Sequence, residues 1–179
     1  TNYIINNNYT STPVVGIEPS CLLTFNDEYN SLKNIENKEK IKNKFYLIEE
    51  FILEKIKDGK KVSTNKFSNN VLVHGHCHQK SQDRLKGLLE LLTTLNIKHK
   101  PIETSCCGMA GSFGYDAKNY DISKKMAHVT LVPTIKKEFK NDDIIVANGT
   151  SCRSQIFDFS DQKPQHVSQL LFKIFETIN

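Results

Sequence analysis

Four short runs of apolar residues predict the β-strands of this chain. They cover residues 14–17, 71–74, 97–102 and 144–147, and the third run is the weakest because lysine and histidine interrupt it. Apolar runs of this length, without a polar residue at every second position, are typical of strands buried on both faces of a parallel sheet. We therefore expect a parallel sheet.

Helical patterns separate these strands. Apolar residues recur every three or four positions in four segments, at residues 45–56, 85–92, 122–131 and 167–175. We expect Gly59 to stop the first helix, and Pro133 to kink or restart the third, because proline cannot donate the backbone hydrogen bond of a helix interior. Strands that alternate with helices of this size predict an α/β fold, with a layered Rossmann-like parallel sheet and flanking helices.

The composition indicates one globular domain. The chain has 179 residues, of which 38% are hydrophobic and 25% charged, which is enough for one domain with a core and hardly enough for two. We expect residues 1–12 to be an extended or disordered segment and residues 13–179 to form the domain.

Charge and hydropathy exclude several classes of function. The net charge is +4, but only Arg84 and Arg153 among the 24 cationic side chains are arginines, and nucleic-acid surfaces rely on arginine for bidentate contacts. No apolar stretch is long enough for a transmembrane helix, and the first residues do not resemble a signal peptide. We expect a cytoplasmic protein, either free or peripheral at the inner face of the membrane, that binds no nucleic acid.

A cysteine follows each of the predicted strands. Cys21 follows the first, Cys77 the second, the adjacent Cys106 and Cys107 the third, and Cys152 the fourth. Because ligands of open parallel sheets bind at the carboxyl ends of the strands, we expect all five thiols to meet at one edge of one sheet, and none to lie inside a helix or strand. An odd number of cysteines, two of them adjacent, indicates metal or thiol chemistry in a reduced compartment rather than a disulfide framework.

Other residue types beside the cysteines suit such a site. Gly108 and Gly149 would allow the backbone to approach a bound group closely, and exposed amides there would donate hydrogen bonds to thiolates or to the sulfides of a cluster. Arg153 would stabilise negative charge at the site.

The histidines near Cys77 leave more than one interpretation open. His76 and His78 flank this cysteine and are either metal ligands, proton carriers or turn residues that cap the backbone. His74 lies inside a predicted strand, and we interpret it as structural.

Three kinds of chemistry remain open at this point. Thiolate-rich sites accept iron–sulfur clusters or zinc. A third possibility is thiol redox chemistry at the adjacent Cys106 and Cys107, with Cys77 or Cys152 as the resolving thiol, because adjacent cysteines form strained disulfides that are easily reduced.

Three motifs resemble a known family. HGHCHQK at residues 74–80, SCCGMAGSFGY at 105–115 and NGTSCR at 148–153 are similar to the cysteine-rich CCG domain of iron–sulfur oxidoreductase subunits. These include a subunit of heterodisulfide reductase, the iron–sulfur subunits of glycolate and lactate oxidation systems, and the small subunit of anaerobic glycerol-3-phosphate dehydrogenase. The family motif is a cysteine, a Cys-Cys-Gly and a Cys-x-x-Cys, usually in two copies. This chain matches the second copy, except that Gly149 replaces one cysteine, and Glu18 replaces a cysteine of an incomplete first copy.

The likeness extends over residues 13–172 to the C-terminal region of large fused flavoproteins that resemble D-lactate or D-2-hydroxyglutarate dehydrogenases. It implies an iron–sulfur cluster of the 4Fe–4S kind, or zinc in aerobic preparations, at one site formed by the five cysteines with His76 and His78. It further implies FAD and a ferredoxin-like module elsewhere in the parent chain or in a partner subunit, a small 2-hydroxy acid as substrate, and electron transfer from the flavin to an acceptor. On this view the chain is a C-terminal fragment that does not oxidise the substrate alone.

Overall fold

The computed structural model describes residues 11–33, 39 and 44–175. Most of the expected N-terminal segment, residues 1–12, therefore lies outside the described residues. The helices and strands are β1 (Val14–Gly16), α2 (Pro19–Leu23), α3 (Glu28–Ser31), β2 (Phe45–Leu47), α4 (Ile48–Lys57), β3 (Val71–His74), α5 (Cys77–Ser81), α6 (Leu85–Thr94), β4 (His99–Pro101), η3 (Phe113–Tyr115), η4 (Ala117–Asn119), α7 (Tyr120–Val129), α8 (Leu131–Glu138), β5 (Ile144–Ala147), α9 (Thr150–Ser160) and α10 (Val167–Ile174).

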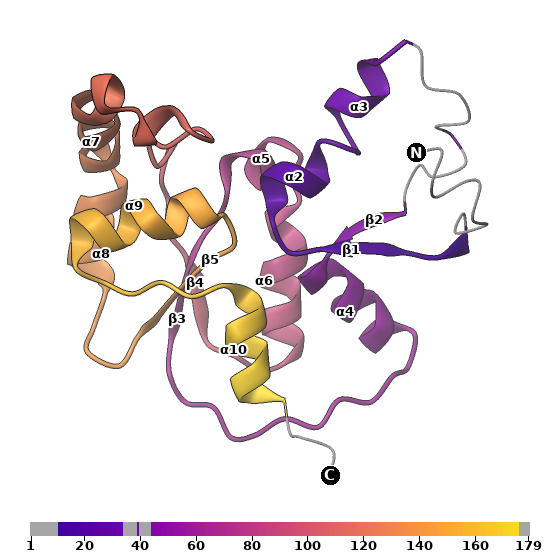
Figure 1. The fold of residues 1–179 in the computed structure, drawn as a ribbon. Helices are drawn as coiled ribbons and strands as arrows, with labels where there is room; N and C mark the ends of the chain where they lie inside the picture. The colour runs from indigo at the N-terminus through magenta and orange to yellow at the C-terminus, as the bar shows by residue number, and fades with distance from the viewer. Residues whose placement is uncertain (1–10, 34–38, 40–43, 176–179) are drawn as a thin grey trace.

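A three-stranded parallel sheet lies at the centre of the fold, in the order β4-β3-β5. The chain leaves β3 through α5 and α6 to reach β4 on one side, and then returns through α7 and α8 to β5 on the other side (Figure 1). The two connections therefore leave the central strand in opposite directions. In open parallel sheets, such a reversal creates a crevice at the carboxyl ends of the strands.

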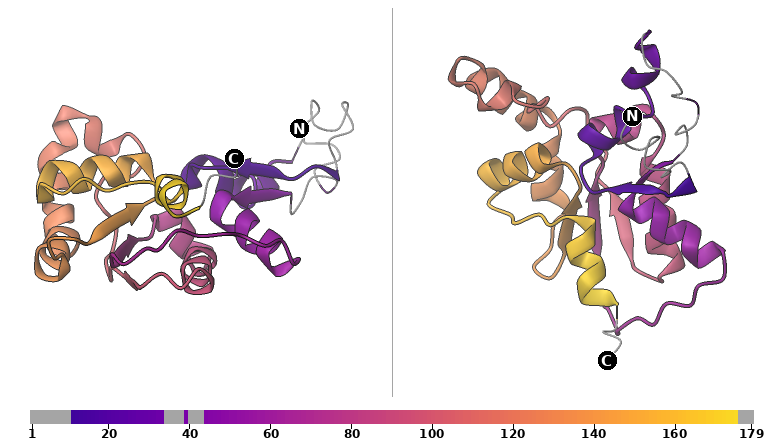
Figure 2. Two further views of the ribbon diagram at one scale, coloured as in Figure 1. Left: turned by 90° about the horizontal axis from the view of Figure 1, so that it is seen from below. Right: turned by 45° about the vertical axis from the view of Figure 1, so that its right-hand side comes forward.

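Helices cover both faces of this sheet, as Figure 1 and Figure 2 show. Side chains alternate between the faces along each strand, so Val71 and Val73 point to one face and Leu72 to the other. The first face packs against leucines of α6 and α10, and the second against Leu131 of α8 and Ile156 of α9. The expected α/β fold with a parallel sheet and flanking helices is thus confirmed.

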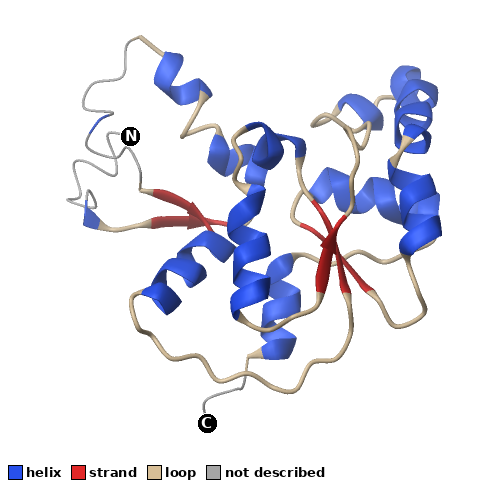
Figure 3. Cartoon of the chain, turned by 180° about the vertical axis from the view of Figure 1, so that it is seen from behind, coloured by secondary structure: helices blue, strands red, loops and turns tan. Residues whose placement is uncertain are grey.

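The first two strands form a sheet of their own, which the sequence did not predict. β1 pairs with β2 in parallel, and Leu22, Leu23, Phe45 and Leu47 form a separate small core beside it. Figure 3 shows the strands of the two sheets as separate groups. The expectation of one sheet was wrong, and so was the helix from residue 45, because Phe45–Leu47 is a strand and α4 begins at Ile48.

Two burial patterns also differ from the expectation. The run at residues 14–17 is not buried on both faces, since Val15 is 40% exposed and Ile17 59% exposed at the edge of a two-stranded sheet. In the segment that Pro133 was expected to interrupt, the helix does break at Thr130 between α7 and α8, but α7 buries its small residues Ser123 and Ala127 rather than Ile122. Within the described residues, no helix combines the length and the apolar character that crossing a membrane requires.

Candidate metal centre

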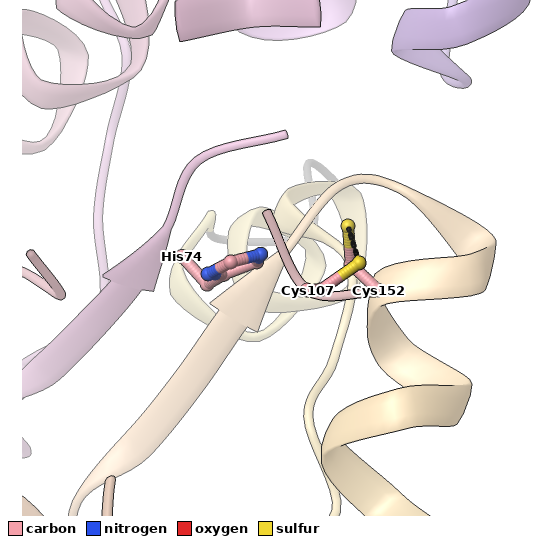
Figure 4. A group of neighbouring side chains, drawn as sticks. All are labelled: His74, Cys107 and Cys152. Carbon is pink, nitrogen blue, oxygen red and sulfur yellow. Dashed lines mark hydrogen bonds between the residues drawn. The ribbon is translucent and has the colours of Figure 1, made fainter. Parts of the chain in front are cut away.

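Two cysteines meet at the carboxyl end of the three-stranded sheet. Cys107 follows β4, and Cys152 lies in the first turn of α9, which follows β5. Their sulfur atoms are 3.6 Å apart, and both residues are buried. Figure 4 shows the two sulfurs facing one another. The carboxyl ends of two strands that are far apart in the sequence thus place two thiols in contact.

His74 is the third member of this group. Its ring nitrogen and the two sulfurs all lie within 4.8 Å of one another, and Figure 4 shows the ring beside the pair. His74 is the last residue of β3 and lies two residues after Leu72, whose side chain packs in the same cluster as Cys107 and Cys152. The period of two along a strand therefore explains why His74 points to the thiols. Its Nδ1 is 3.2 Å from the Thr104 hydroxyl.

The contact between the sulfurs makes the two thiols unequal. The hydrogen bond from Cys152 lowers the pKa of the Cys107 thiol, and His74 lowers it further, although burial acts in the opposite direction. The same hydrogen bond and burial raise the pKa of Cys152. Cys107 is therefore the thiolate of the pair, and a thiolate is the form that binds metals and acts as a nucleophile.

Cys77 and Cys106 lie near this pair. Burial raises the pKa of the Cys77 thiol, and the charges of Cys106 and Cys107 raise it further. Cys77 follows β3 and Cys106 follows β4, so both stand at the carboxyl end of the sheet, as the pair does. Cys77 is the first residue of α5 and lies on the exposed side of the group. Four of the five cysteines thus lie at the carboxyl end of one sheet, and two of them, Cys107 and Cys152, are in contact.

The Cys-Cys-Gly turn is held by its glycine and by a glutamine of α9. Gly108 has φ +98°, and a Cβ at this position would lie 2.5 Å from the Ser123 carbonyl oxygen. The Gly108 N–H donates to the Cys106 sulfur over 3.3 Å. Gln155, which is buried, donates to the carbonyl of Cys107 over 2.8 Å and to Ser123. Sequence reasoning missed Gln155, although its position one helical turn after Cys152 places it on the same face of α9.

The space that a side chain at residue 149 would need is taken by a histidine. A Cβ at Gly149 would lie 2.4 Å from His76 Cδ2 and 3.1 Å from the Cys152 sulfur. His76 is buried and caps the N-terminus of α5, where its Nδ1 accepts from the His78 N–H over 3.2 Å. Burial lowers the pKa of His76, which favours the neutral imidazole. His76 therefore lies beside the thiols but caps a helix.

His78 and Cys21 lie apart from the thiol group. His78 Nε2 lies 3.6 Å from a Glu28 oxygen and 3.9 Å from an Asp27 oxygen, so its ring faces an acidic pair between α2 and α3. Cys21 is exposed on α2. Among the described residues, the group of thiols that could share a metal ion consists of Cys107 and Cys152 with His74. Cys21, Cys77, Cys106, His76 and His78 lie outside that group. The expectation that no cysteine lies within a helix was wrong, since Cys21 lies in α2, Cys152 lies in α9, and Cys77 is the first residue of α5.

Arg153 and Glu18 hold the loop that leads to Cys152. The Arg153 guanidinium donates to the carbonyls of Ala147 and Asn148 over 2.9 and 2.6 Å. Glu18 Oε2 accepts from both the N–H and the hydroxyl of Thr150, over 2.9 and 2.8 Å. Glu18 therefore connects the two-stranded sheet to the N-terminus of α9.

This arrangement of cysteines can be compared with known proteins. A family model described as "CCG: Cysteine-rich domain" matches residues 71–157, a range that contains β3, β4, β5 and the four neighbouring cysteines. Residues 71–157 therefore resemble a CCG domain. The match confirms the resemblance that the three sequence motifs indicated, and it places the Cys107–Cys152 pair within the region that defines the family.

Curated relatives of the chain include dehydrogenases and a dehydrogenase subunit. The chain is 25% identical over 161 residues to a subunit of the anaerobic glycerol-3-phosphate dehydrogenase of Escherichia coli, and this match covers 89% of the chain and 39% of that protein. It is 23% identical over 163 residues to the D-2-hydroxyglutarate dehydrogenase of Pseudomonas putida and 26% identical over 168 residues to that of Escherichia coli. These matches cover 90% and 92% of the chain, but 15% and 16% of the two dehydrogenases. No solved structure matches the chain significantly.

Proposed function

We propose that this chain is the metal-binding, electron-transferring CCG domain of an FAD-dependent D-2-hydroxyacid dehydrogenase of the D-lactate, D-2-hydroxyglutarate or glycolate type. The observation that carries the proposal is the contact between Cys107 and Cys152 beside His74, within the matched region. An iron–sulfur cluster is the cofactor we propose, and the parent chain or a partner subunit would contribute the FAD-binding and ferredoxin-like modules.

The donor atoms fit such a group. The sulfur atoms of Cys107 and Cys152 are in contact, Cys106 is next to Cys107 in the chain, and Cys77 begins the helix that follows the central strand. Cysteine thiolates are the usual ligands of iron–sulfur clusters, and histidine replaces cysteine in some of them. We therefore propose Cys77, Cys106, Cys107 and Cys152 as ligands, with His74 as the neighbouring imidazole. A bound cluster would supply one-electron transfer.

The chain's own residues would shape that site. The Gly108 N–H donates to the Cys106 sulfur, and Gln155 fixes the carbonyl of Cys107. Hydrogen bonds to sulfur and burial of the site influence the reduction potential of a cluster. The reaction that this would serve, oxidation of a small 2-hydroxy acid, belongs to a protein longer than this chain, since the chain covers 39% or less of the curated relatives named above.

Low-temperature electron paramagnetic resonance tests the electron-transfer role. The chain is purified without oxygen, and spectra are recorded before and after reduction with dithionite. We expect a paramagnetic signal that changes on reduction and is lost in C107S. A protein that binds metal but shows no paramagnetic signal in either state would contradict the electron-transfer role.

Zinc is the second candidate for the bound metal, because the same donor atoms also fit a zinc site. Two thiols and an imidazole are a common part of tetrahedral zinc sites, and Cys107, Cys152 and His74 offer that combination. The nitrogen ligand would then be His74 rather than His76 or His78. Such a site would be structural or would polarise a substrate at an interface with the flavin module. Zinc found in place of iron in oxygen-free protein would support it.

Thiol redox chemistry is the third candidate, at a different pair from the one the sequence suggested. The 3.6 Å separation of the Cys107 and Cys152 sulfurs places these two thiols, rather than the adjacent Cys106 and Cys107, in position to form a disulfide. The two thiols would lose two electrons and two protons to an added oxidant such as diamide. Peptide mapping of oxidised, metal-free protein should then find Cys107 bonded to Cys152, and a bond elsewhere would contradict this candidate.

A further inference from the structure

A buried carboxyl group contacts both the helix that begins at Cys77 and the loop before the helix that carries Cys152. Glu49 is the second residue of α4, and its side chain is 1% exposed. No cation in the described part of the chain forms an ion pair with it. The neighbouring Glu50 binds Arg84 instead. A buried carboxylate without a counter-ion is costly, so its hydrogen bonds need an explanation.

These hydrogen bonds connect both loops to one oxygen atom. Glu49 Oε1 accepts from Gln79 Nε2 over 2.9 Å and from Asn148 Nδ2 over 2.7 Å. Gln79 lies in α5, which begins at Cys77, and Asn148 lies in the loop before α9, which carries Cys152. Glu49 thus contacts the elements that carry two of the proposed ligands without contacting a ligand itself.

Each amide passes the connection on to the backbone. Gln79 Oε1 accepts from the His76 N–H over 3.3 Å, and Asn148 Oδ1 accepts from the Val167 N–H over 3.1 Å. Rotating either amide group away from Glu49 would therefore break both of its hydrogen bonds. If the acceptor at Glu49 were lost, both amides would be left with an unpaired donor in a buried site, which costs free energy.

In the part of the chain that the structure describes, the side chains that hydrogen-bond to Glu49 carry no positive charge. Gln79 from α5 and Asn148 from the β5–α9 loop are neutral, and Glu50 on its own helix is negative. Burial, together with the charge of Glu50, raises the pKa of Glu49 to about 7 overall, although its own backbone N–H and the two amides act in the opposite direction.

We propose that Glu49, in its neutral form, is a positioning residue that holds α5, which begins at Cys77, to the loop before α9, which carries Cys152. Ionisation of Glu49 favours separation of these two segments, the Cys77 and Cys152 loops. The reason is linkage: a buried carboxylate gains solvation when the loops separate, whereas the neutral carboxyl gains little. Ionisation must therefore favour any state in which water reaches Glu49. The inference concerns loop positions and is independent of which metal the site binds.

Thiol labelling in metal-free, reduced protein tests this inference. Iodoacetamide labelling of the buried Cys152 is followed by mass spectrometry at pH 6 and pH 8, with the exposed Cys21 as internal reference. Variants are compared at the same pH, so the ionisation of the thiol cancels in each ratio. Glu49→Gln keeps an uncharged acceptor, and Glu49→Ala removes it. Glu54→Gln, on the exposed side of the same helix, is the matched control.

The two halves of the proposal predict different ratios. At pH 6 the E49A variant should label Cys152 faster than wild type, while E49Q should label it at nearly the wild-type rate. At pH 8 wild type should label roughly tenfold faster than E49Q, because an upward shift of the carboxyl pKa converts into a bias toward the open form. E54Q should follow wild type at both values. Equal rates of E49A and wild type at pH 6, or of E49Q and wild type at pH 8, would overturn the proposal.

A second measurement needs no variant. The side-chain amide resonances of Gln79 and Asn148 are followed by NMR in the wild-type chain between pH 5.5 and 8.5. Both should shift with one common midpoint close to the pKa of Glu49, about 7, since both donate to the same oxygen. Resonances that stay constant over this range would overturn the proposal even if the variants do not fold.

Discussion

Glu18 closes the N-terminus of the helix that carries Cys152, because its carboxylate accepts from both the N–H and the hydroxyl of Thr150. Glu18 therefore connects the segment after β1 to the helix that follows β5. A negative side chain at a helix N-terminus is stabilising, both through the hydrogen bond and through the helix dipole.

We expect Glu18→Ala to lower the free energy of unfolding at pH 7 by about 1–2 kcal/mol, the usual cost of losing a helix cap. Burial raises the pKa of Glu18, but the hydrogen bonds from Thr150 and Ser20 outweigh it, so that the pKa is lowered overall. The stabilisation is therefore present at neutral pH and is lost as the pH falls through the lowered pKa. Urea unfolding at pH 7 and pH 3 checks this expectation.

The control for this prediction is Glu103→Ala, which changes an exposed carboxylate after β4. It should leave the unfolding free energy unchanged at both pH values. A loss in E18A that is as large at pH 3 as at pH 7 would show that the side chain acts through packing rather than through its charge.

Gly149 is required by the position of His76. We expect Gly149→Ala to destabilise the fold by about 1–3 kcal/mol, the usual cost of overpacking, because a Cβ there would lie 2.4 Å from the histidine ring. Thermal unfolding of G149A, H76A and the double variant measures the interaction. The double variant should be more stable than the sum of the single effects predicts, and strict additivity would contradict this explanation.

The Cys152 hydrogen bond should control the reactivity of Cys107. In metal-free protein, Cys152→Ala removes the bond that lowers the pKa of the Cys107 thiol, so alkylation of Cys107 should require a higher pH. Cys152→Ser keeps a hydroxyl donor and is expected to preserve more of the wild-type profile. The measurement is the rate of iodoacetamide labelling against pH, and identical profiles in all three proteins would refute the assignment of Cys107 as the thiolate.

Strand positions and cysteine placement could be predicted from the sequence because both depend on local pattern. The run at residues 71–74 reads as a buried strand, and Cys77, Cys107 and Cys152 follow strands that are neighbours in one parallel sheet. The same reasoning wrongly placed Cys21 at the edge of that sheet, whereas it is exposed on α2. The pairing of β1 with β2 could not be predicted, because it is a contact between two segments that are distant in the sequence. In addition, the three residues of β2 continue directly into α4, so the apolar pattern of the helix obscured the strand.

The position of His74 beside the thiols could have been predicted from the alternation of side chains along its strand. Its place at the end of a strand suggested a structural residue, yet alternation along that strand puts it on the side of Leu72 and the thiols. His76 and His78, which flank Cys77 directly, are directed by helix geometry to a cap and to an acidic pair. Closeness to Cys77 in the sequence was therefore a poorer guide to the histidine nearest the thiols than the direction in which each strand or helix points its side chains.

The most direct test of the account is the content of iron, acid-labile sulfide and zinc per chain in protein purified without oxygen. It is measured in wild type, C107S, C152S and the control C21S, whose altered cysteine is exposed and lies outside the thiol group. We predict iron and sulfide in near-equal amounts in wild type and C21S, and their loss in C107S and C152S. Full metal content in C107S or C152S, or a wild-type protein that binds neither iron nor zinc, would contradict a metal centre at this pair.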